Sequence, residues 1–158
     1  MKTTKGDMLL KKTDKVLISH LRRDGRKNVT DIAREENIPA TTIYDRVKIV
    51  DNRYVKKHSL IMDFNKVGYP IVSYITIDLK DKKSNLKNHL MESPNINSLF
   101  SMNYGTKLLA EAVFRNIDEL DKFIENLQGN FSIERLHADY VTEELKRETF
   151  LTDLSHFD

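Results

Sequence analysis

The stretch DIAREENIPATTIYDRVK, residues 31–48, decides how the N-terminal part of the chain folds. Ile32 and Ala33 come early in one helical segment, where a small residue lets a following helix cross closely. Asn37 stands in the break that follows and can take the positive φ that a tight turn needs. Ile43, in the next segment, is spaced to pack back against the first. The stretch therefore predicts two short helices joined by a tight turn.

A further helix is expected before this pair. Leu17, Ile18 and Leu21 lie on one helical face. Asp24-Gly25 should end that helix, with Gly25 in the left-handed conformation. Apolar residues recur at helical spacing in all three segments, which gives each helix a side that faces a core. We expect these helices over residues 14–23, from residue 28 to about residue 35, and over residues 40–52.

The second half of the chain alternates strand-like and helical segments. The run IVSYITIDL, residues 71–79, is rich in β-branched and aromatic residues, which favours a strand. Tyr104-Gly105 marks a turn between two later strand-like runs. The expected order of strand, helix, strand, strand, helix and strand is the ferredoxin-like arrangement. The segments are residues 71–79, 84–91, 96–102, 107–114, 117–127 and 133–141.

These elements predict an α+β protein with two domains. A three-helix helix-turn-helix domain, similar to a winged helix, should span residues 13–54, and a ferredoxin-like βαββαβ domain residues 69–141. Residues 1–12 are lysine-rich and are expected to form a flexible basic arm, and residues 55–68 a connector. The apolar side chains of a tail, residues 142–158, either cover the subunit's own sheet, which we favour, or form a helix for a partner.

Charge is divided unevenly along the chain. Residues 1–60 hold 15 Lys/Arg and 8 Asp/Glu, a net +7, whereas residues 61–158 hold 11 and 16, a net −5. A basic first part favours a polyanionic partner, although chance clustering of solvated charges gives the same asymmetry. The sequence has no run near the roughly 20 apolar residues of a membrane span and no apolar signal core at its charged N-terminus. We therefore expect a cytoplasmic protein that enters no membrane.

The outward side of the helix over residues 40–52 carries the candidate binding residues. Its first turns would reach base edges if the helix entered a major groove. Nearby cations can contact phosphates, which positions a protein on DNA without reading its sequence. Asp45 can accept a hydrogen bond from cytosine, or it can instead pair with Arg46 or Lys48. The residues expected to read bases are Thr41, Thr42, Tyr44 and Asp45, and those expected on phosphates are Arg46, Lys48 and Arg53.

Short matches in a fixed order link the chain to a known family. They are Asp14-Lys15, Asp24-Gly25-Arg26, Ile32-Ala33, Thr41-Thr42-Ile43, Arg46-Val47-Lys48 and Asp63 with Gly68-Tyr69. In this order, from about residue 13 to residue 141, the chain resembles the Lrp/AsnC (feast/famine) regulators of bacteria and archaea. The resemblance implies a head that binds double-stranded DNA and a C-terminal domain that pairs subunits through its sheet. It also implies assembly of dimers into octamers and amino-acid binding between subunits.

Several positions depart from the family's pattern. Pro39 stands where the family has a serine N-cap for its recognition helix, and Asn37 replaces the turn glycine. The family's glycine after the third helix is missing around Arg53-Tyr54. Tyr44-Asp45 is unusual at base-reading positions, so the family's operator sequences do not carry over.

The resemblance also places an effector loop between the second and third strands of the C-terminal domain, with Gly105 matching the family's glycine. The loop residues are Asn103, Tyr104, Gly105, Thr106 and Lys107, with no acid before Glu111. An ammonium group there lacks a charge-assisted hydrogen bond, which is worth about 1.5–3 kcal/mol. Lys107 would repel an ammonium and attract a carboxylate, or else point to solvent while the loop packs between dimers. We therefore expect no binding of neutral amino acids such as leucine, and leave an acidic metabolite open as a small-molecule effector.

Other chemistry finds little support in the sequence. The five histidines are far apart and have no metal-ligand spacing, and the absence of cysteine excludes thiolate sites. We expect no metal, no cofactor and no enzymatic activity, because an acyl-phosphate hydrolase on the ferredoxin-like domain would need an anion-cradling loop with a fixed arginine. The predicted function is a sequence-specific DNA-binding transcription regulator that acts as a homodimer or larger assembly. The alternative is an architectural, weakly specific DNA-packaging protein.

Overall fold

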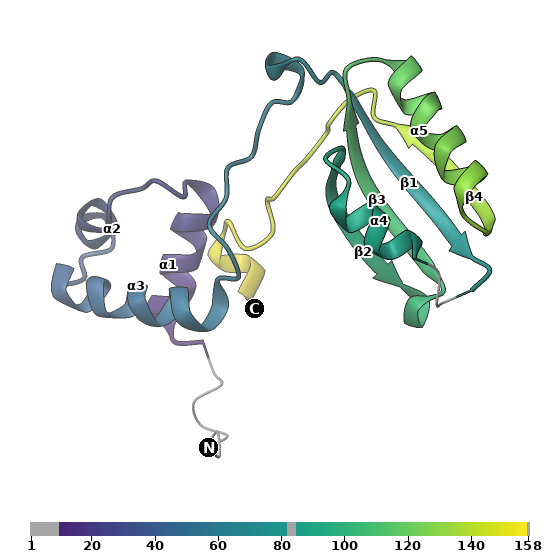
Figure 1. The fold of residues 1–158 in the computed structure, drawn as a ribbon. Coiled ribbons are helices and arrows are strands. Elements are labelled where there is room, and N and C mark those ends of the chain that lie inside the picture. The colour runs from purple at the N-terminus through teal and green to yellow at the C-terminus, as the bar shows by residue number, and fades with distance from the viewer. Residues whose placement is uncertain (1–9, 82–84, 158) are drawn as a thin grey trace. The chain divides into compact units, whose positions relative to one another are not determined.

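The computed structural model describes residues 10–81 and 85–157, and in it the chain forms two compact units (Figure 1). The first unit combines the chain up to Leu60 with the C-terminal segment from Leu145 onward, and the second is Ile61–Glu144. The chain therefore leaves the first unit, builds the second and returns to the first.

Three helices build the first unit: α1 (Lys12–Arg23), α2 (Val29–Glu35) and α3 (Ala40–Tyr54). Their inward side chains share one core, as the helical spacing predicted. The residues of that core are Leu17, Ile32, Ala33, Ile43 and Val50. After α3, residues 55–62 are all described and pair with no strand, so the β-wing of a winged helix is absent there.

The turn between α2 and α3 depends on Asn37. Its φ of 54° lies in the left-handed region that the sequence predicted, and the next residue, Ile38, donates its backbone N–H to the carbonyl of Ala33 at 3.0 Å. At the end of α1, by contrast, the expectation for Gly25 is wrong, because Gly25 is not among the residues with positive φ. That helix ends instead at Asp24, which is extended (φ −146°) and whose N–H donates to the carbonyl of His20 at 2.9 Å.

A buried ion pair joins α1 to α3. Asp14 is 1% exposed, and its carboxylate accepts two hydrogen bonds from the Arg46 guanidinium, Nε to Oδ1 at 2.7 Å and Nη2 to Oδ2 at 2.5 Å. The same carboxylate accepts from the backbone N–H of Lys11 at 3.2 Å. A bidentate pair fixes the direction as well as the distance of its partner. The ion pair therefore sets how α3 lies on α1.

The C-terminal tail lies on the helical unit. Its last turn, the 3-10 helix η4 (Leu154–Phe157), packs against α1. The expectation that the tail covers the subunit's sheet is therefore wrong, since residues from Leu145 onward belong to the first unit.

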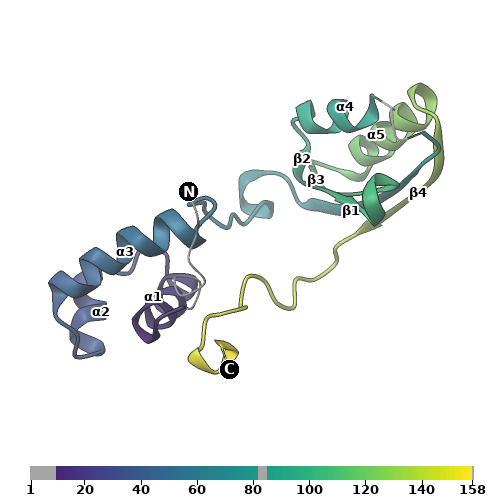
Figure 2. The same cartoon turned by 90° about the horizontal axis from the view of Figure 1, so that it is seen from below.

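The second unit is a four-stranded antiparallel sheet with two helices on one side (Figure 2). Along the chain the elements are β1 (Ile71–Leu79), α4 (Leu86–Glu92), β2 (Ile96–Met102), β3 (Lys107–Phe114), α5 (Ile117–Asn130) and β4 (Ile133–Tyr140). Short 3-10 turns precede β1 (η2, Asn65–Val67) and link β2 to β3 (η3, Asn103–Gly105). The strand order is β2-β3-β1-β4, which confirms the predicted βαββαβ arrangement.

The two faces of this sheet differ. One face packs on the helices through a core that includes Ile75, Ile77, Leu108, Phe114 and the helix residues Leu86, Leu90, Leu120 and Leu127. Because side chains alternate along a strand, Tyr74, Leu109 and Phe100 point to the opposite face, which no helix of this unit covers. We call this opposite side the open sheet face.

The Asp14–Arg46 ion pair gives a direct test of how the helical unit is held. Arg46→Ala should lower the free energy of unfolding by about 3 kcal/mol, because it leaves the Asp14 carboxylate buried without its counter-charge. Lys48→Ala, an exposed neighbour on the same helix, should change it by less than about 0.5 kcal/mol. Urea unfolding followed by circular dichroism measures both, and equal effects of the two substitutions would contradict this role for Arg46.

Candidate nucleic-acid interface

The exposed side of α3 gathers most of the residues predicted to read DNA. Thr41, Tyr44, Asp45 and Lys48 are three or four residues apart and all exposed, so they lie on one face of the helix. Thr42 is exposed beside them at the helix start. The aromatic ring of Tyr44 is half exposed, at 50%. The opposite side of α3 carries Ile43 and Val50, which are buried in the core. Their burial keeps the exposed face of α3 turned towards solvent.

The start of α3 adds a positive electrostatic end to this face. Pro39 is the N-cap and makes no side-chain capping bond, and the first turn of the helix carries no acid. The first N–H groups of a helix have no intrahelical partner, and the helix dipole makes this end attract anions. The departure from a serine cap thus leaves backbone donors beside Thr41 and Thr42, where a phosphate oxygen can be bound.

The three cations expected on phosphates differ in their settings. Lys48 is exposed on the reading face, and Arg53 is exposed near the end of α3. Arg46 is held by Asp14, with only 17% of its side chain exposed. The structure thus gives the Arg46 guanidinium an internal partner, the Asp14 carboxylate, which the sequence did not indicate. Asp45 is exposed, and the neighbouring Arg46 guanidinium binds Asp14.

A polar network at the end of α2 was missed by sequence reasoning. His20 is 7% exposed, and its Nε2 lies 2.7 Å from Oε1 of Glu36. Lys27 Nζ lies 3.2 Å from His20 Nδ1 and donates to Glu35 at 2.5 Å. The hydrogen bond from Lys27 holds the pKa of Glu35 below its ordinary value. These contacts place hydrogen-bond donors beside the carboxylates of Glu35 and Glu36. No sequence motif indicates them, because His20 and Glu36 come together only in the folded chain.

The loop predicted to hold an effector has an unusual backbone. Asn103, Tyr104 and Gly105 all have positive φ, at 50°, 54° and 85°. Gly105 is therefore present for its conformation, since a Cβ there would meet only Ser101 Oγ at an ordinary 3.9 Å. Lys107 does not point freely to solvent, because its Nζ lies 3.2 Å from a carboxylate oxygen of Asp78 on β1.

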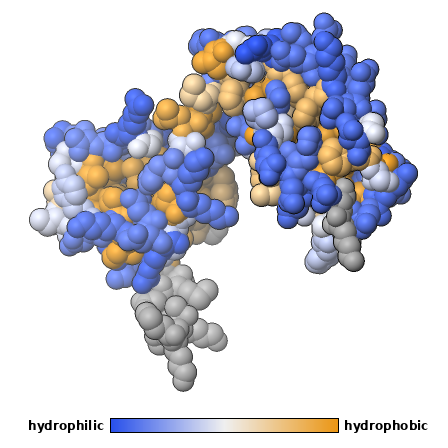
Figure 3. All heavy atoms as spheres, viewed as in Figure 1, coloured by the Kyte–Doolittle hydropathy of each residue, from blue (hydrophilic) through white to orange (hydrophobic). Residues whose placement is uncertain are grey.

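The open sheet face combines apolar side chains with one enclosed carboxylate. Tyr74, Phe100 and Met102 are 36%, 52% and 38% exposed. Between them Glu111, only 5% exposed, accepts hydrogen bonds from Asn97 Nδ2 at 2.7 Å and Ser98 Oγ at 2.8 Å. Figure 3 shows that apolar patches also reach the visible surface of each unit between its polar side chains.

No group of three or more His, Cys, Asp or Glu in the part of the chain that the structure describes could hold a metal ion. Among the described helices, none is long and apolar enough to cross a membrane.

Comparison by sequence finds related transcription regulators. The chain is 26% identical over 117 residues to an uncharacterized HTH-type transcriptional regulator of Pyrococcus abyssi, covering 73% of this chain and 74% of the relative. It is 24% identical over 144 residues to the HTH-type transcriptional regulator FL11 of Pyrococcus horikoshii, covering 90% and 95%. No protein-family model matches the chain.

Comparison by structure finds the same architecture in solved proteins. Bacillus subtilis LrpC superposes with a TM-score of 0.77 at 17% identity, covering 88% of this chain and 99% of that one. Escherichia coli AsnC gives 0.72 at 17% identity, covering 88% and 96%. The regulator NMB0573 of Neisseria meningitidis, solved as a complex with L-Met, gives 0.78 at 18% identity, covering 88% and 94%. The resemblance indicated by the ordered residues is thus confirmed: this chain has the fold of the Lrp/AsnC regulators and is related in sequence to HTH-type transcriptional regulators.

Proposed function

We propose that this protein is a transcription regulator that binds double-stranded DNA through α3 and acts as a homodimer or a larger assembly. The observation that carries the proposal is the exposed face of α3. Thr41, Tyr44 and Lys48 project from a helix whose uncapped start favours phosphate and whose other side is fixed in a core. The related HTH-type regulators support the same function.

Dimerisation supplies what one head lacks. One recognition helix covers few base pairs, so two heads reading half-sites about one helical turn apart give a longer and more specific site. The open sheet face suits the pairing of subunits because it exposes Tyr74, Phe100 and Met102 on a sheet whose other face is already filled. Covering such apolar side chains is favourable by about 25 cal/mol for each Å² removed from water.

An amino-acid effector needs a free carboxylate for its ammonium group. The acid that pairs in register with Lys107 is Asp78, and Lys107 already compensates its charge at 3.2 Å. We therefore keep the proposal that neutral amino acids do not bind at this loop. The complex of the Neisseria protein with L-Met shows the competing outcome in a protein of the same fold.

Lys48 tests the phosphate contact. Lys48→Ala should weaken binding to all DNA sequences alike and make the plot of log affinity against log salt shallower by about one ion. Lys122→Ala, an exposed lysine on α5 of the other unit, should leave both quantities unchanged. Fluorescence anisotropy with a labelled duplex at several salt concentrations measures this. A salt slope identical in Lys48→Ala and the unsubstituted protein would overturn the placement of Lys48 on a phosphate.

Tyr44 tests the reading of bases. Tyr44→Ala should change which duplexes are preferred, at a cost of about 1–3 kcal/mol on the original site, while binding to random DNA stays the same. Selection from a random duplex library, repeated with both proteins, reveals the preference. The reading role is refuted if both proteins select the same sequences with the same affinities.

Phe100 tests the open sheet face as the subunit interface. The intact chain should scatter light as at least twice its mass of 18.5 kDa at micromolar concentration, and Phe100→Asp should reduce that mass. A charge there would have to be desolvated inside the interface. Met91→Asp, on the exposed side of α4, changes a similarly exposed apolar residue and should keep the assembly intact. Dissociation by Met91→Asp alone would place the interface elsewhere.

Calorimetry tests the effector loop. Titration of the twenty amino acids should give no isotherm for leucine, isoleucine or methionine at millimolar concentration, because Asp78 is neutralised. Lys107→Met removes the cation that pairs with the Asp78 carboxylate. This variant should therefore bind neutral amino acids more tightly than the unsubstituted protein does. Sub-millimolar binding of leucine by the unsubstituted protein would show the expectation to be wrong.

A further inference from the structure

Helix α1 has a second buried face that the core of the helical unit does not explain. Val16 and Ser19 are only 3% and 4% exposed, and Val16 does not belong to the apolar core built around Leu17. At 100° per residue, both lie on the side of the helix opposite the one that Leu17 and Leu21 turn to the core. The Ser19 hydroxyl donates to the carbonyl of Val16 at 2.9 Å, so burial leaves it satisfied. Something outside the three-helix core covers this side of α1.

The C-terminal segment packs against α1 through η4, and three cations of α1 bind that segment. Lys15 Nζ donates to the carbonyl of Phe157 at 3.2 Å and also lies 5.7 Å from the centre of the Phe157 ring. Arg23 Nη2 donates to the carbonyl of Thr152 at 2.9 Å. On the helical wheel, Lys15 and Arg23 share the arc that holds Val16 and Ser19, so the contacts come from one continuous face.

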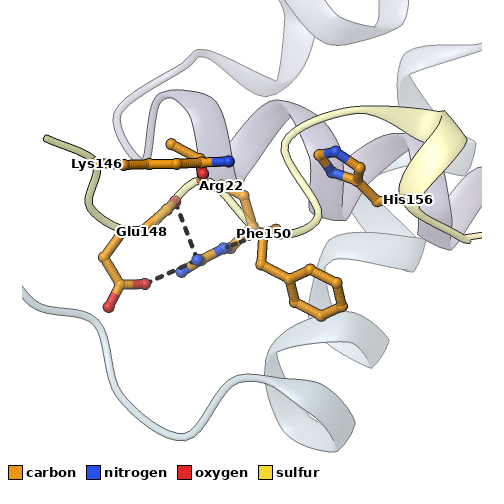
Figure 4. Close-up of a pocket in the computed structure, with 6 residues that line it drawn as sticks. Arg22, Lys146, Glu148, Phe150 and His156 are labelled. Carbon is orange, nitrogen blue, oxygen red and sulfur yellow. Dashed lines mark hydrogen bonds and ion pairs between the residues drawn. The ribbon is translucent and has the colours of Figure 1, made fainter.

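Arg22 makes the densest set of contacts. Its Nε donates to the carbonyl of Phe150 at 3.0 Å and its Nη2 to the carbonyl of Glu148 at 3.1 Å. The same guanidinium pairs with the Glu148 carboxylate at 2.7 Å. Figure 4 shows the Arg22 side chain reaching towards Glu148 and Phe150 of the segment. Arg22 lines an open hollow of about 460 Å³ together with Lys146, Glu148, Thr149, Phe150 and His156. Because Arg22 is already bound by the segment's own oxygens, the occupant of this face is the segment itself.

The backbone of the segment is shaped by this contact. Glu148 and Leu151 have φ of 53° and 63°. This left-handed region is energetically unfavourable for any residue that has a side chain. Such conformations persist where surrounding contacts over-determine them. Both residues flank Phe150, whose carbonyl binds Arg22. The strain lies where the segment bends to present its carbonyls to α1.

We propose that residues 145–157 form a clasp, a built-in ligand for the outer face of α1 that completes the helical unit within the same chain. The side chains of Arg22, Arg23 and Lys15 recognise the segment by donating hydrogen bonds to its backbone carbonyls. The chain leaves this unit at Leu60 and re-enters it at Leu145, so the clasp joins the C-terminal segment to α1 by non-covalent contacts.

Hydrogen exchange on the intact chain tests the clasp. Arg22→Gln combined with Arg23→Gln removes the charge-assisted donors and should speed amide exchange over residues 148–157 by at least about tenfold. Arg26→Gln combined with Arg34→Gln removes the same charge from other exposed positions of the unit and should leave that exchange unchanged. Circular dichroism confirms that both double variants are folded. The clasp is refuted if residues 148–157 exchange equally fast in all three proteins, or equally faster in both variants.

Discussion

The fork of hydrogen bonds between Asp14 and Arg46 is the constraint on which the helical unit depends. Apolar contacts hold α1 and α3 together, but hydrophobic burial is non-directional and tolerates sliding. A bidentate carboxylate–guanidinium pair tolerates little sliding, because both bonds of 2.7 and 2.5 Å must be kept at once. A buried ion pair adds little net stability, but breaking it leaves a charge without compensation. Its contribution is therefore to fix the orientation in which α3 presents its exposed face.

That orientation connects local sequence to function. With Ile43 and Val50 turned inward, Thr41, Tyr44 and Lys48 must turn outward, and the uncapped start of the helix lies beside them. The same logic holds in the second unit, where filling one face of the sheet leaves Phe100 on the other. A single reading helix with a pairing surface elsewhere in the chain is the arrangement that a dimeric reader of half-sites requires.

Elements with a strong internal period were predictable from the sequence, and contacts between distant segments were not. The helices over the first 54 residues and the βαββαβ order follow from apolar spacing, and Asn37 takes the positive φ expected of it. Arg46 looked like a phosphate ligand because its partner lies 32 residues away and nothing in the spacing marks Asp14 as buried. The docking of the C-terminal tail on α1 could not be predicted from the sequence either. Its contacts use backbone carbonyls, which every residue has. The contact between Asp78 and Lys107 was missed because only the pairing of β1 with β3 brings these two residues together.

A sequence-specific regulator and a DNA-packaging protein would share this helical unit and the proposed pairing surface. They differ in one quantity, the preference for a particular DNA site. The most direct measurement is selection of genomic fragments by the purified protein, followed by competition of the selected fragment with random DNA at two salt concentrations. A regulator that reads bases through α3 should prefer its selected fragment by about 10³-fold or more at physiological salt, and the preference should persist as salt weakens both affinities. Equal competition by random DNA at both salt concentrations would contradict sequence-specific regulation.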